Sequence, residues 1–376
     1  MIASTGLGIE IENARIKCVL ASSAGIRSRE YALSFASGGD REEQLEAGLL
    51  EALARFEREV ELPLAGVPTA VAASCHFAFP TFGQAHGAVL HVLERHLPRA
   101  FLAAADGLYS LDRVQATGSH LRFVLGRTAG IRAVAEAFSG AQLAIDCGST
   151  STEAVRLTGS RATGHQTDPD RDSRDRLQDG RLTWLGAFDT PVDYVAERAG
   201  GYRLVPRMAR MRSIWAIAPS ASGTARAMRG LPSSGPGSAP EARGLAALAI
   251  KLVDADAARR ELAQAVGLDA ELLGDDILGI ADEVRSAAVA MLCESWRRVI
   301  GAGEPPREAA VMGWGAHLLA EPALRALGVK RIVDVEDAAG VPPNFAAALG
   351  LAIASITPEN SPGAQLRGAG RTDTRR

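Results

Sequence analysis

The chain has few aromatic residues, few cysteines, no long apolar run and no dominant charge. Aromatic side chains make up only 5% of its 376 residues, whereas hydrophobic residues make up 47% and charged residues 23%. This balance is typical of a soluble globular protein and argues against a disordered or fibrous chain. The length exceeds that of one small core and favours two lobes of ordinary domain size.

The near-neutral charge limits the classes of partner. A formal net charge of −3 gives no broad attraction to nucleic acid or to an anionic membrane, and we expect neither. No apolar stretch reaches the about 20 residues that a membrane-spanning helix needs. The first residues also lack the basic and apolar segments of a signal peptide, so we expect a cytoplasmic protein.

Cysteine is scarce and widely spaced. The four cysteines form no CxxC pair, which argues against a zinc site built on thiolates. Each lies in an apolar stretch, and this predicts buried, reduced thiols. They are Cys18, Cys75, Cys147 and Cys293.

Hydrophobic periodicity predicts alternating strands and helices. The predicted strands cover 7–20 (two strands around a turn at 12–14), 26–35, 68–73, 101–105, 143–145, 153–157, 309–312 and 331–335. The predicted helices cover 41–60, 84–97, 130–138, 275–300, 316–327 and 344–354. Exposed or flexible loops are predicted at 164–180 and 230–240.

Two blocks of the chain each begin with an apolar strand, a polar turn and a returning strand. This weak repeat suits a duplicated α/β fold with a cleft between its lobes. We therefore predict an N-terminal lobe at 1–140 and a C-terminal lobe at 141–357 with a helical insertion at about 241–300. Residues 358–376 are predicted to be a disordered tail. It stays open whether the last helix returns to the first lobe.

The strongest chemical motif is a loop near the middle of the chain. It runs Asp146, Cys147, Gly148, Ser149, Thr150, Ser151, Thr152. Glycine admits an anion close to backbone N–H groups, hydroxyl side chains add donors, and the carboxylate could hold a hydrated Mg²⁺. A tight hairpin built on Asx and Ser/Thr turns uses the same residue types. The sequence alone leaves both interpretations open.

Two further turns could line a ligand. Gly313 and Gly315 follow a strand and precede a helix, so a nucleotide base or sugar could lie against bare backbone there. A tight strand-to-helix turn would equally need them. His317 comes next, where it could face a ligand, cap or pack. The N-terminal turn from Gly8 to Lys17 could form a first phosphate loop or a plain charged hairpin.

Other histidines give weaker signals. Cys75 and His76 are adjacent on a predicted strand and would point to opposite faces, which opposes a nucleophile–base pair. His86, His91 and His96 are spaced five residues apart on a predicted helix, so they turn around it and do not predict a metal site.

The order of these motifs resembles the actin/Hsp70/sugar-kinase superfold. More closely, the chain is similar to hydantoinase/oxoprolinase-related proteins of tetrahydromethanopterin-linked one-carbon transfer. Further matching stretches lie at 175–186 and 189–192, and the matches span about 7 to 355. The group includes the archaeal enzyme of methanofuran biosynthesis that joins an aminomethylfuran diphosphate to glutamyl-tyramine with loss of diphosphate.

The resemblance implies a fold, a reaction and a site. The fold would be α/β, a two-lobed actin-like ATPase (ASKHA, ribonuclease H-like) fold with mixed sheets flanked by helices. The reaction would condense an aminomethylfuran diphosphate with a tyrosine- or tyramine-type acceptor. Asp146 and Lys17 would be catalytic, and Asp146 would hold Mg²⁺, with Glu10 as a further metal ligand. Gly148, Ser149, Thr150, Ser151 and Thr152 would bind phosphate, and Gly313 and Gly315 the organic part.

Partners and nucleotide use follow less directly. The resemblance implies a phosphorylated or diphosphorylated small molecule as ligand, and it is compatible with a protein partner or a homo-oligomer. Whether ATP binds stays open.

The sequence also departs from this group. The group's first loop reads like D-I-G-G-A-N-x-K, whereas here Glu10 replaces the aspartate and Glu12-Asn13 replace the glycines. A bulky anionic side chain at that place opposes phosphate binding. A second segment, FATTADV-like in the group, reads differently at 213–218. Two alternatives therefore remain: a non-catalytic partner subunit or paralogue, and an ATP-dependent small-molecule kinase or hydrolase.

Overall fold

The computed structural model describes residues 5–105, 107–117, 123, 126–157, 176, 178–217 and 255–356. These residues form two compact units. The first contains the described residues up to Ala137 and again from Phe345 onward, and the second contains those between Phe138 and Asn344. The predicted tail at 358–376, the loop at 230–240 and most of the loop at 164–180 lie outside the described residues.

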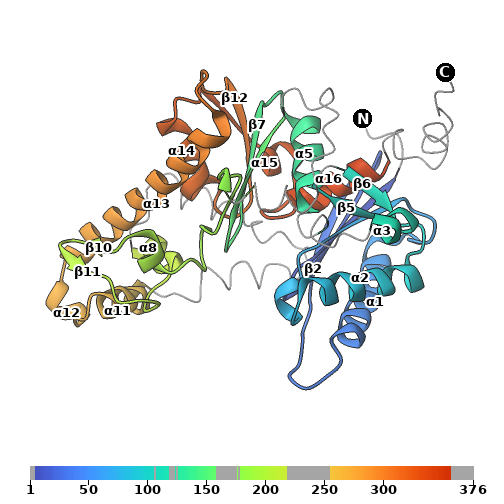
Figure 1. The fold of residues 1–376 in the computed structure, drawn as a ribbon, viewed down its shortest axis with the longest axis horizontal. Helices are drawn as coiled ribbons and strands as arrows, with labels where there is room; N and C mark the ends of the chain where they lie inside the picture. Colours follow the sequence, from blue (N-terminus) through green and yellow to red (C-terminus); the bar gives the residue numbers. More distant parts are fainter. Residues whose placement is uncertain are drawn as a thin grey trace, which may run out of the picture. The chain divides into compact units, whose positions relative to one another are not determined.

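The first unit is built on a six-stranded mixed sheet in the order β3-β2-β1-β4-β5-β6. Its strands β2, β5 and β6 are labelled in Figure 1. The first three strands are an antiparallel meander, β4 and β5 continue parallel to β1, and β6 returns antiparallel. The strands are β1 (Gly6–Ile11), β2 (Arg15–Ser22), β3 (Gly25–Ala32), β4 (Thr69–Ala73), β5 (Phe101–Ala104) and β6 (Gly107–Ser110).

Alternation along β1 sends its side chains to two different helical layers. Leu7, Ile9 and Ile11 are buried in a core with α1 (Arg41–Val60) and α2 (Phe82–His96). On the other face, a Cβ placed on Gly8 would lie 1.8 Å from the Ala348 carbonyl oxygen of α16. Helix α16 (Ala346–Ser355) therefore approaches the sheet so closely that only glycine fits beneath it.

Helix α5 (Arg127–Phe138) packs on α16 in the same way. A Cβ on Gly130 would lie 2.2 Å from the Ala347 carbonyl oxygen, and one on Gly350 would lie 1.8 Å from the Gly130 carbonyl oxygen. The first unit is completed by two short elements, η1 (His76–Ala78) and α3 (Leu111–Thr117). Thus α16, near the end of the described chain, is part of the first unit.

The second unit contains a five-stranded mixed sheet in the order β13-β12-β7-β8-β9. Again three strands form an antiparallel meander, and two more continue parallel to the first of them. The strands are β7 (Leu143–Cys147), β8 (Thr152–Arg156), β9 (Leu182–Thr183), β12 (Glu308–Met312) and β13 (Arg331–Asp334).

Helices cover this sheet and extend from it. The longest, α13 (Asp276–Ile300), buries Ile277, Ile280, Val284, Ala288 and Val299, whereas Met291 is only partly buried. The remaining elements are α7 (Val192–Val195), β10 (Arg198–Ala199), β11 (Tyr202–Arg203), α8 (Met211–Ile217), α11 (Ala255–Ala265), α12 (Ala270–Leu273), α13 (Asp276–Ile300), η2 (Ala316–Ala320), α14 (Glu321–Ala326) and α15 (Val335–Ala339).

The two sheets share one arrangement, a three-stranded meander whose first strand is followed in the sheet by two parallel strands. The predicted fold class is therefore confirmed as α/β, with mixed sheets flanked by helices, and the same strand arrangement occurs in both units. The predicted helix at 316–327 is divided into η2 and α14, with a proline in the first turn of α14.

Two further sequence predictions can be compared with the structure. All four cysteines are free and buried, which confirms the prediction of buried thiols. Among the described residues, none of the helices combines the length and apolarity needed to cross a bilayer.

Candidate functional site

The loop after Asp146 is a tight hairpin between β7 and β8. The N–H of Gly148 donates to the Ser151 carbonyl 2.9 Å away, which closes the turn around Ser149 and Thr150. The hairpin that the sequence left as an alternative is therefore the local structure. A closed turn of this kind presents hydrogen-bond donors at its tip.

Residues 187–189 donate hydrogen bonds to two carbonyl groups of this hairpin. Ala187 donates its N–H to the Gly148 carbonyl at 2.9 Å, and Phe188 and Asp189 both donate to the Ser149 carbonyl, at 3.0 and 2.9 Å. Within the described part of the chain, the N–H groups of Ser149, Thr150 and Ser151 have no acceptor. The tip thus presents three N–H donors, while the carbonyl groups of Gly148, Ser149 and Ser151 are already hydrogen-bonded.

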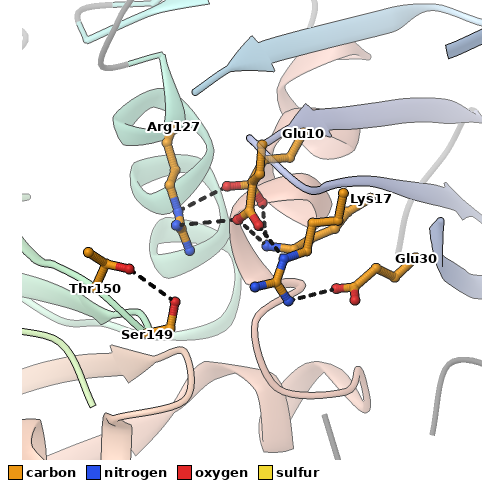
Figure 2. A network of polar contacts seen from close by, with 8 residues as sticks. Glu10, Lys17, Glu30, Arg127, Ser149 and Thr150 are labelled. Atoms are coloured by element: carbon orange, nitrogen blue, oxygen red, sulfur yellow. Dashed lines mark hydrogen bonds and ion pairs between the residues drawn. The ribbon is translucent and has the colours of Figure 1, made fainter. Parts of the chain in front are cut away.

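The hydroxyl groups of Ser149 and Thr150 lie at the same tip, 3.4 Å apart (Figure 2). Thr150 is exposed and Ser149 and Ser151 are partly exposed. Successive N–H groups and hydroxyls of this kind are the donors that bind phosphate oxygens. The predicted phosphate-binding residues at 149–151 are therefore brought together at one place.

Thr152 differs from its neighbours. Its side chain is 1% exposed, and its hydroxyl donates to the Leu185 carbonyl at 2.5 Å and lies 3.1 Å from the Cys147 sulfur. This hydroxyl holds the hairpin to the segment that follows β9. Its predicted phosphate-binding role stays a prediction.

A glycine and a threonine fix the supporting segment. A Cβ on Gly186 would lie 2.4 Å from the Thr150 nitrogen, so only glycine allows the two backbones to approach this closely. The N–H of Gly186 donates to the buried hydroxyl of Thr190 at 2.8 Å. The position of the hairpin tip therefore depends on residues 186–190.

Asp146 and Gly313 meet at the ends of neighbouring parallel strands. A Cβ on Gly313 would lie 2.6 Å from Oδ1 of Asp146, and Gly313 has a φ of +84°, which other residues rarely adopt. The Gly313 N–H donates to Oε2 of Glu336 at 3.0 Å. Two buried carboxylates, each on a residue that is 3% exposed, thus converge on this glycine.

Gly315 is also required by packing. Its N–H donates to the Cys147 carbonyl at 2.8 Å, and a Cβ there would lie 2.2 Å from the Cys147 sulfur. Burial raises the pKa of the Cys147 thiol to about 12, although a hydrogen bond from Thr152 opposes the shift, so the thiol is not a nucleophile at neutral pH. The alternative of a tight strand-to-helix turn describes the local structure, and a ligand there stays a prediction.

The first unit holds the remaining predicted catalytic and metal-binding residues, Lys17 and Glu10. Lys17 of β2 lies opposite Glu10 of β1 in register, and both side chains are fully buried (Figure 2). The Lys17 ammonium lies 3.2 Å from Oε2 of Glu10 and 2.6 Å from Oε1 of Glu12. Arg127, at the start of α5, places Nε 3.1 Å from the other Glu10 oxygen. Both oxygens of Glu10 therefore face cations.

Arg15 and Glu30 extend this network toward the edge of the sheet. Arg15 lies 2.7 Å from a Glu12 oxygen and 3.4 Å from a Glu30 oxygen. Burial alone would raise the pKa of Glu12, but attraction by Lys17, Arg15 and Arg127 outweighs it and lowers the pKa to about 2. Three acidic and three basic side chains thus neutralise one another at the turn expected to be the first phosphate loop. The predicted roles of Lys17 as catalyst and Glu10 as metal ligand stay predictions.

A pocket of about 590 Å³ opens beside the hairpin tip in the second unit. The side chains of Trp184 and Tyr194 are 42% and 50% exposed, which is high for large aromatic residues. The backbone N–H of Arg207 donates to Oδ1 of Asp193 at 2.8 Å. The pocket is lined by Thr150, Trp184, Asp189, Thr190, Pro191, Asp193, Tyr194 and Arg207.

The sequence pointed to this pocket only indirectly. The stretches at 175–186 and 189–192 are part of the resemblance to hydantoinase/oxoprolinase-related proteins. They contain Trp184 and the residues from Asp189 to Pro191, which line the pocket. Tyr194 had no signal of its own, because a single aromatic residue is common in loops, and Arg207 is one of four arginines in the basic run 203–212 that no motif distinguishes. Tyr194 and Arg207 line the same pocket only because of how the chain folds between α7 and α8.

The other histidines form no joint site among the described residues. His91 and His96 of α2 each contact a glutamate of α1, Glu42 and Glu46 respectively. Burial raises the pKa of the Cys75 thiol to about 12, which leaves it unreactive at neutral pH.

The comparisons with known proteins leave the family open. No family model matches the chain, and no curated protein matches it. The resemblance to hydantoinase/oxoprolinase-related proteins therefore stays a prediction.

Solved structures give remote likenesses. Component A of the (R)-2-hydroxyglutaryl-CoA dehydratase of Acidaminococcus fermentans has a TM-score of 0.42 at 11% identity, over 93% of this chain and 97% of that one. A ROK family glucokinase from Streptomyces griseus, in complex with glucose and AMPPNP, has a TM-score of 0.40 at 12% identity, over 93% and 98%. An ethanolamine utilization protein from Carboxydothermus hydrogenoformans has a TM-score of 0.39 at 13% identity, over 94% and 91%. Because every score is below 0.5, the fold assignment depends on the strand order and packing of this chain itself.

Proposed function

We propose that this protein is a transferase that binds a diphosphorylated small molecule at the 148–151 hairpin and transfers its organic part to an amine or hydroxyl acceptor, releasing diphosphate. One observation carries the proposal: residues 187–189 satisfy the carbonyl groups of Gly148 and Ser149, and the N–H and hydroxyl donors of the hairpin lie beside a pocket. Such an array stabilises the negative charge that grows on a leaving diphosphate.

The chemistry of the pocket suits a ring that carries an amine. Trp184 and Tyr194 offer aromatic faces for a flat ring, and Asp189 and Asp193 offer carboxylates for a cation. Arg207 adds a permanent positive charge that suits a phosphate group. An aminomethylfuran diphosphate has all three features, which supports a role in methanofuran-type cofactor biosynthesis.

The residues around Asp146 would assist from the strand ends. Asp146 and Glu336 supply oxygen donors only, which is the donor type that Mg²⁺ prefers, so the residues present fit this ion. Bound there, Mg²⁺ would supply positive charge for phosphate oxygens. Gly313 would border the organic part of the ligand. Lys17 would neutralise charge on the leaving group, and this role depends on release from its carboxylate partners.

The binding claim is tested by calorimetry with diphosphate and Mg²⁺. We expect the wild type to bind diphosphate, and Arg207→Ala to weaken binding by about tenfold or more, as loss of a charge-assisted contact does. Arg203→Ala is the matched control, because Arg203 is an exposed arginine 3.5 Å from Glu197 and does not line the pocket. Equal binding by both variants and the wild type would argue against this pocket.

The reaction claim is tested by diphosphate release. An aminomethylfuran diphosphate is mixed with a tyramine-type acceptor, and released diphosphate is measured with and without Mg²⁺. Asp146→Asn should abolish the Mg²⁺-dependent release while the protein stays folded. Release that is unchanged in Asp146→Asn would contradict the assigned role of this carboxylate.

The closed charge network around Lys17 favours a second candidate, a non-catalytic partner or paralogue. In that case the first turn has exchanged phosphate binding for internal ion pairs, and diphosphate release would be absent although the fold is intact. An ATP-dependent kinase or hydrolase is the third candidate. Calorimetry with ATP and ADP separates it from the other two, because only this candidate requires nucleotide binding.

A further inference from the structure

His317, at the start of η2, lies between two acidic side chains. Its Nε2 is 2.7 Å from Oδ2 of Asp334, and its Nδ1 is 3.0 Å from Oε2 of Glu321. Asp337 lies near the same place: one ligand atom from each of His317, Asp334 and Asp337 lies within 4.8 Å of the other two. One imidazole nitrogen from η2 and two carboxylates, one from the end of β13 and one from α15, therefore converge.

We propose that His317, Asp334 and Asp337 bind a divalent first-row transition metal, at a site distinct from Asp146. The proposal goes beyond the proposed function and does not depend on it. In the metal-bound form, Nε2 of His317 and one oxygen of each aspartate are the ligands, and the exposed side of Asp337 leaves room for water.

The surroundings of His317 prepare Nε2 for a metal. When Nδ1 donates its hydrogen to Glu321, the tautomer is fixed and Nε2 presents its lone pair. Glu321 is itself held by Arg325, whose Nε and Nη2 lie 3.0 and 2.6 Å from its Oε1. A carboxylate that orients a histidine in this way is typical of metal centres.

The two carboxylate oxygens of Asp334 have different partners. Oδ1 accepts the N–H groups of Glu336 and Asp337, at 2.9 and 3.0 Å, and so caps α15. Oδ2 is left to face His317. The cap fixes the carboxylate, and the side chains of His317 and Asp334 are each only 12% exposed, so little freedom is lost when a metal binds.

The donor set selects the class of metal. Imidazole nitrogen with carboxylate oxygen suits zinc, iron, cobalt or nickel, whereas Mg²⁺ prefers oxygen ligands alone.

The site would also connect to the Gly313 turn. Asp334 and Asp337 flank Glu336, whose Oε2 accepts the Gly313 N–H. His317 lies four residues after Gly313. A metal held by His317, Asp334 and Asp337 would therefore link the segment after Gly313 to the start of α15. We expect metal binding to raise the thermal stability of the protein.

The experiment uses the full chain after removal of metals. Zn²⁺ is titrated by calorimetry, and Co²⁺ by its visible absorption. We expect the wild type to bind one equivalent more than Asp337→Asn, and Glu321→Gln to bind that equivalent about 10- to 100-fold more weakly. Asp337→Asn is chosen because Asp337 is exposed, so the substitution leaves the buried packing unchanged.

Two controls separate this site from others. His91→Gln removes an exposed histidine that contacts a single glutamate and should bind as the wild type does. Asp146→Asn should keep the zinc equivalent, so failure of the proposed function is distinguishable from failure of this site. The proposal is overturned if Asp337→Asn binds Zn²⁺ as the wild type does, or if the wild type binds none.

Discussion

The ammonium of Lys17 lies 3.2 Å from Oε2 of Glu10, its partner in register on the neighbouring strand, and both side chains are fully buried. Two charges removed from water in this way persist only when each has enough partners. Arg127 supplies the second cation for Glu10, and Glu12 supplies the second carboxylate for Lys17. The network is therefore sensitive to the loss of any one member.

Lys17→Met tests this sensitivity. The substitution keeps a long apolar side chain but removes the charge, so Glu10 and Glu12 stay buried with fewer cations. We expect the free energy of unfolding to fall by about 3–5 kcal/mol, measured by urea denaturation. Lys330→Met, at an exposed lysine, should change it by less than about 0.5 kcal/mol. Equal stability of the two variants would show that the pairing contributes nothing.

The lowered pKa of Glu12 predicts a specific loss of stability in acid. In the unfolded chain this carboxyl has its ordinary pKa of 4.5, whereas in the folded state it is about 2. Because the folded pKa is the lower one, the stabilisation is complete above about pH 4.5 and is lost as the pH falls toward 2.

The comparison of wild type with Glu12→Gln isolates this effect from other acid-sensitive groups. Their difference in unfolding free energy should be largest near neutral pH and should shrink between pH 4.5 and 2, where Glu12 takes up a proton. Urea denaturation at a series of pH values measures it. A difference that stays constant across this range would contradict the assigned pKa.

Much of the fold could be predicted because local patterns specify it. Alternation at Leu7, Ile9 and Ile11 reflects one buried face of β1, and the apolar stripe of α1 covers that face. Short or irregular elements were missed, among them β6, α3 and α15. Such elements have few residues, so their apolar periodicity is too brief to be recognised.

The site was predicted less completely, for a physical reason. Asp146 and Gly313 were each singled out, but their contact depends on the pairing of β7 with β12, two strands far apart in sequence. The ion pair of Glu10 with Arg127 likewise depends on the packing of α5, and no sequence motif near Arg127 predicts it. Local patterns identify strands and turns, whereas partners across them are set by tertiary packing.

Gly313→Ala tests the contact between the glycine turn and Asp146. Two costs should add: an unfavourable φ of +84°, and a Cβ only 2.6 Å from Oδ1 of Asp146. Gly66→Ala is the matched control, because Gly66 has a φ of +83° with nothing within 4 Å of the added Cβ.

The control should lose about 1–2 kcal/mol from backbone strain alone. Gly313→Ala should lose a further 1–3 kcal/mol, roughly the cost of overpacking. Thermal and urea denaturation measure both variants. If the two variants lost the same amount, Asp146 could move aside freely, and the proposed position of its carboxylate would not be fixed by this turn.

The last prediction concerns the support beneath the hairpin tip. Thr190→Val keeps the shape of the side chain but removes the hydroxyl that accepts the Gly186 N–H at 2.8 Å. Thr190 is 2% exposed, so the freed N–H has little access to water. An unsatisfied buried donor costs about 1–3 kcal/mol, and this should appear as a loss of unfolding free energy.

Thr190→Ser separates the hydrogen bond from packing. Serine keeps the hydroxyl and loses one methyl group, which should cost only about 0.8 kcal/mol. Because residues 187–189 hold the carbonyl groups of Gly148 and Ser149, a displaced segment would also misplace the donors at the tip. Thr190→Val should therefore bind diphosphate more weakly than Thr190→Ser at a temperature where both are folded. If both variants bound it equally, the tip would be held by the hairpin alone, and the supporting role of residues 186–190 would be wrong.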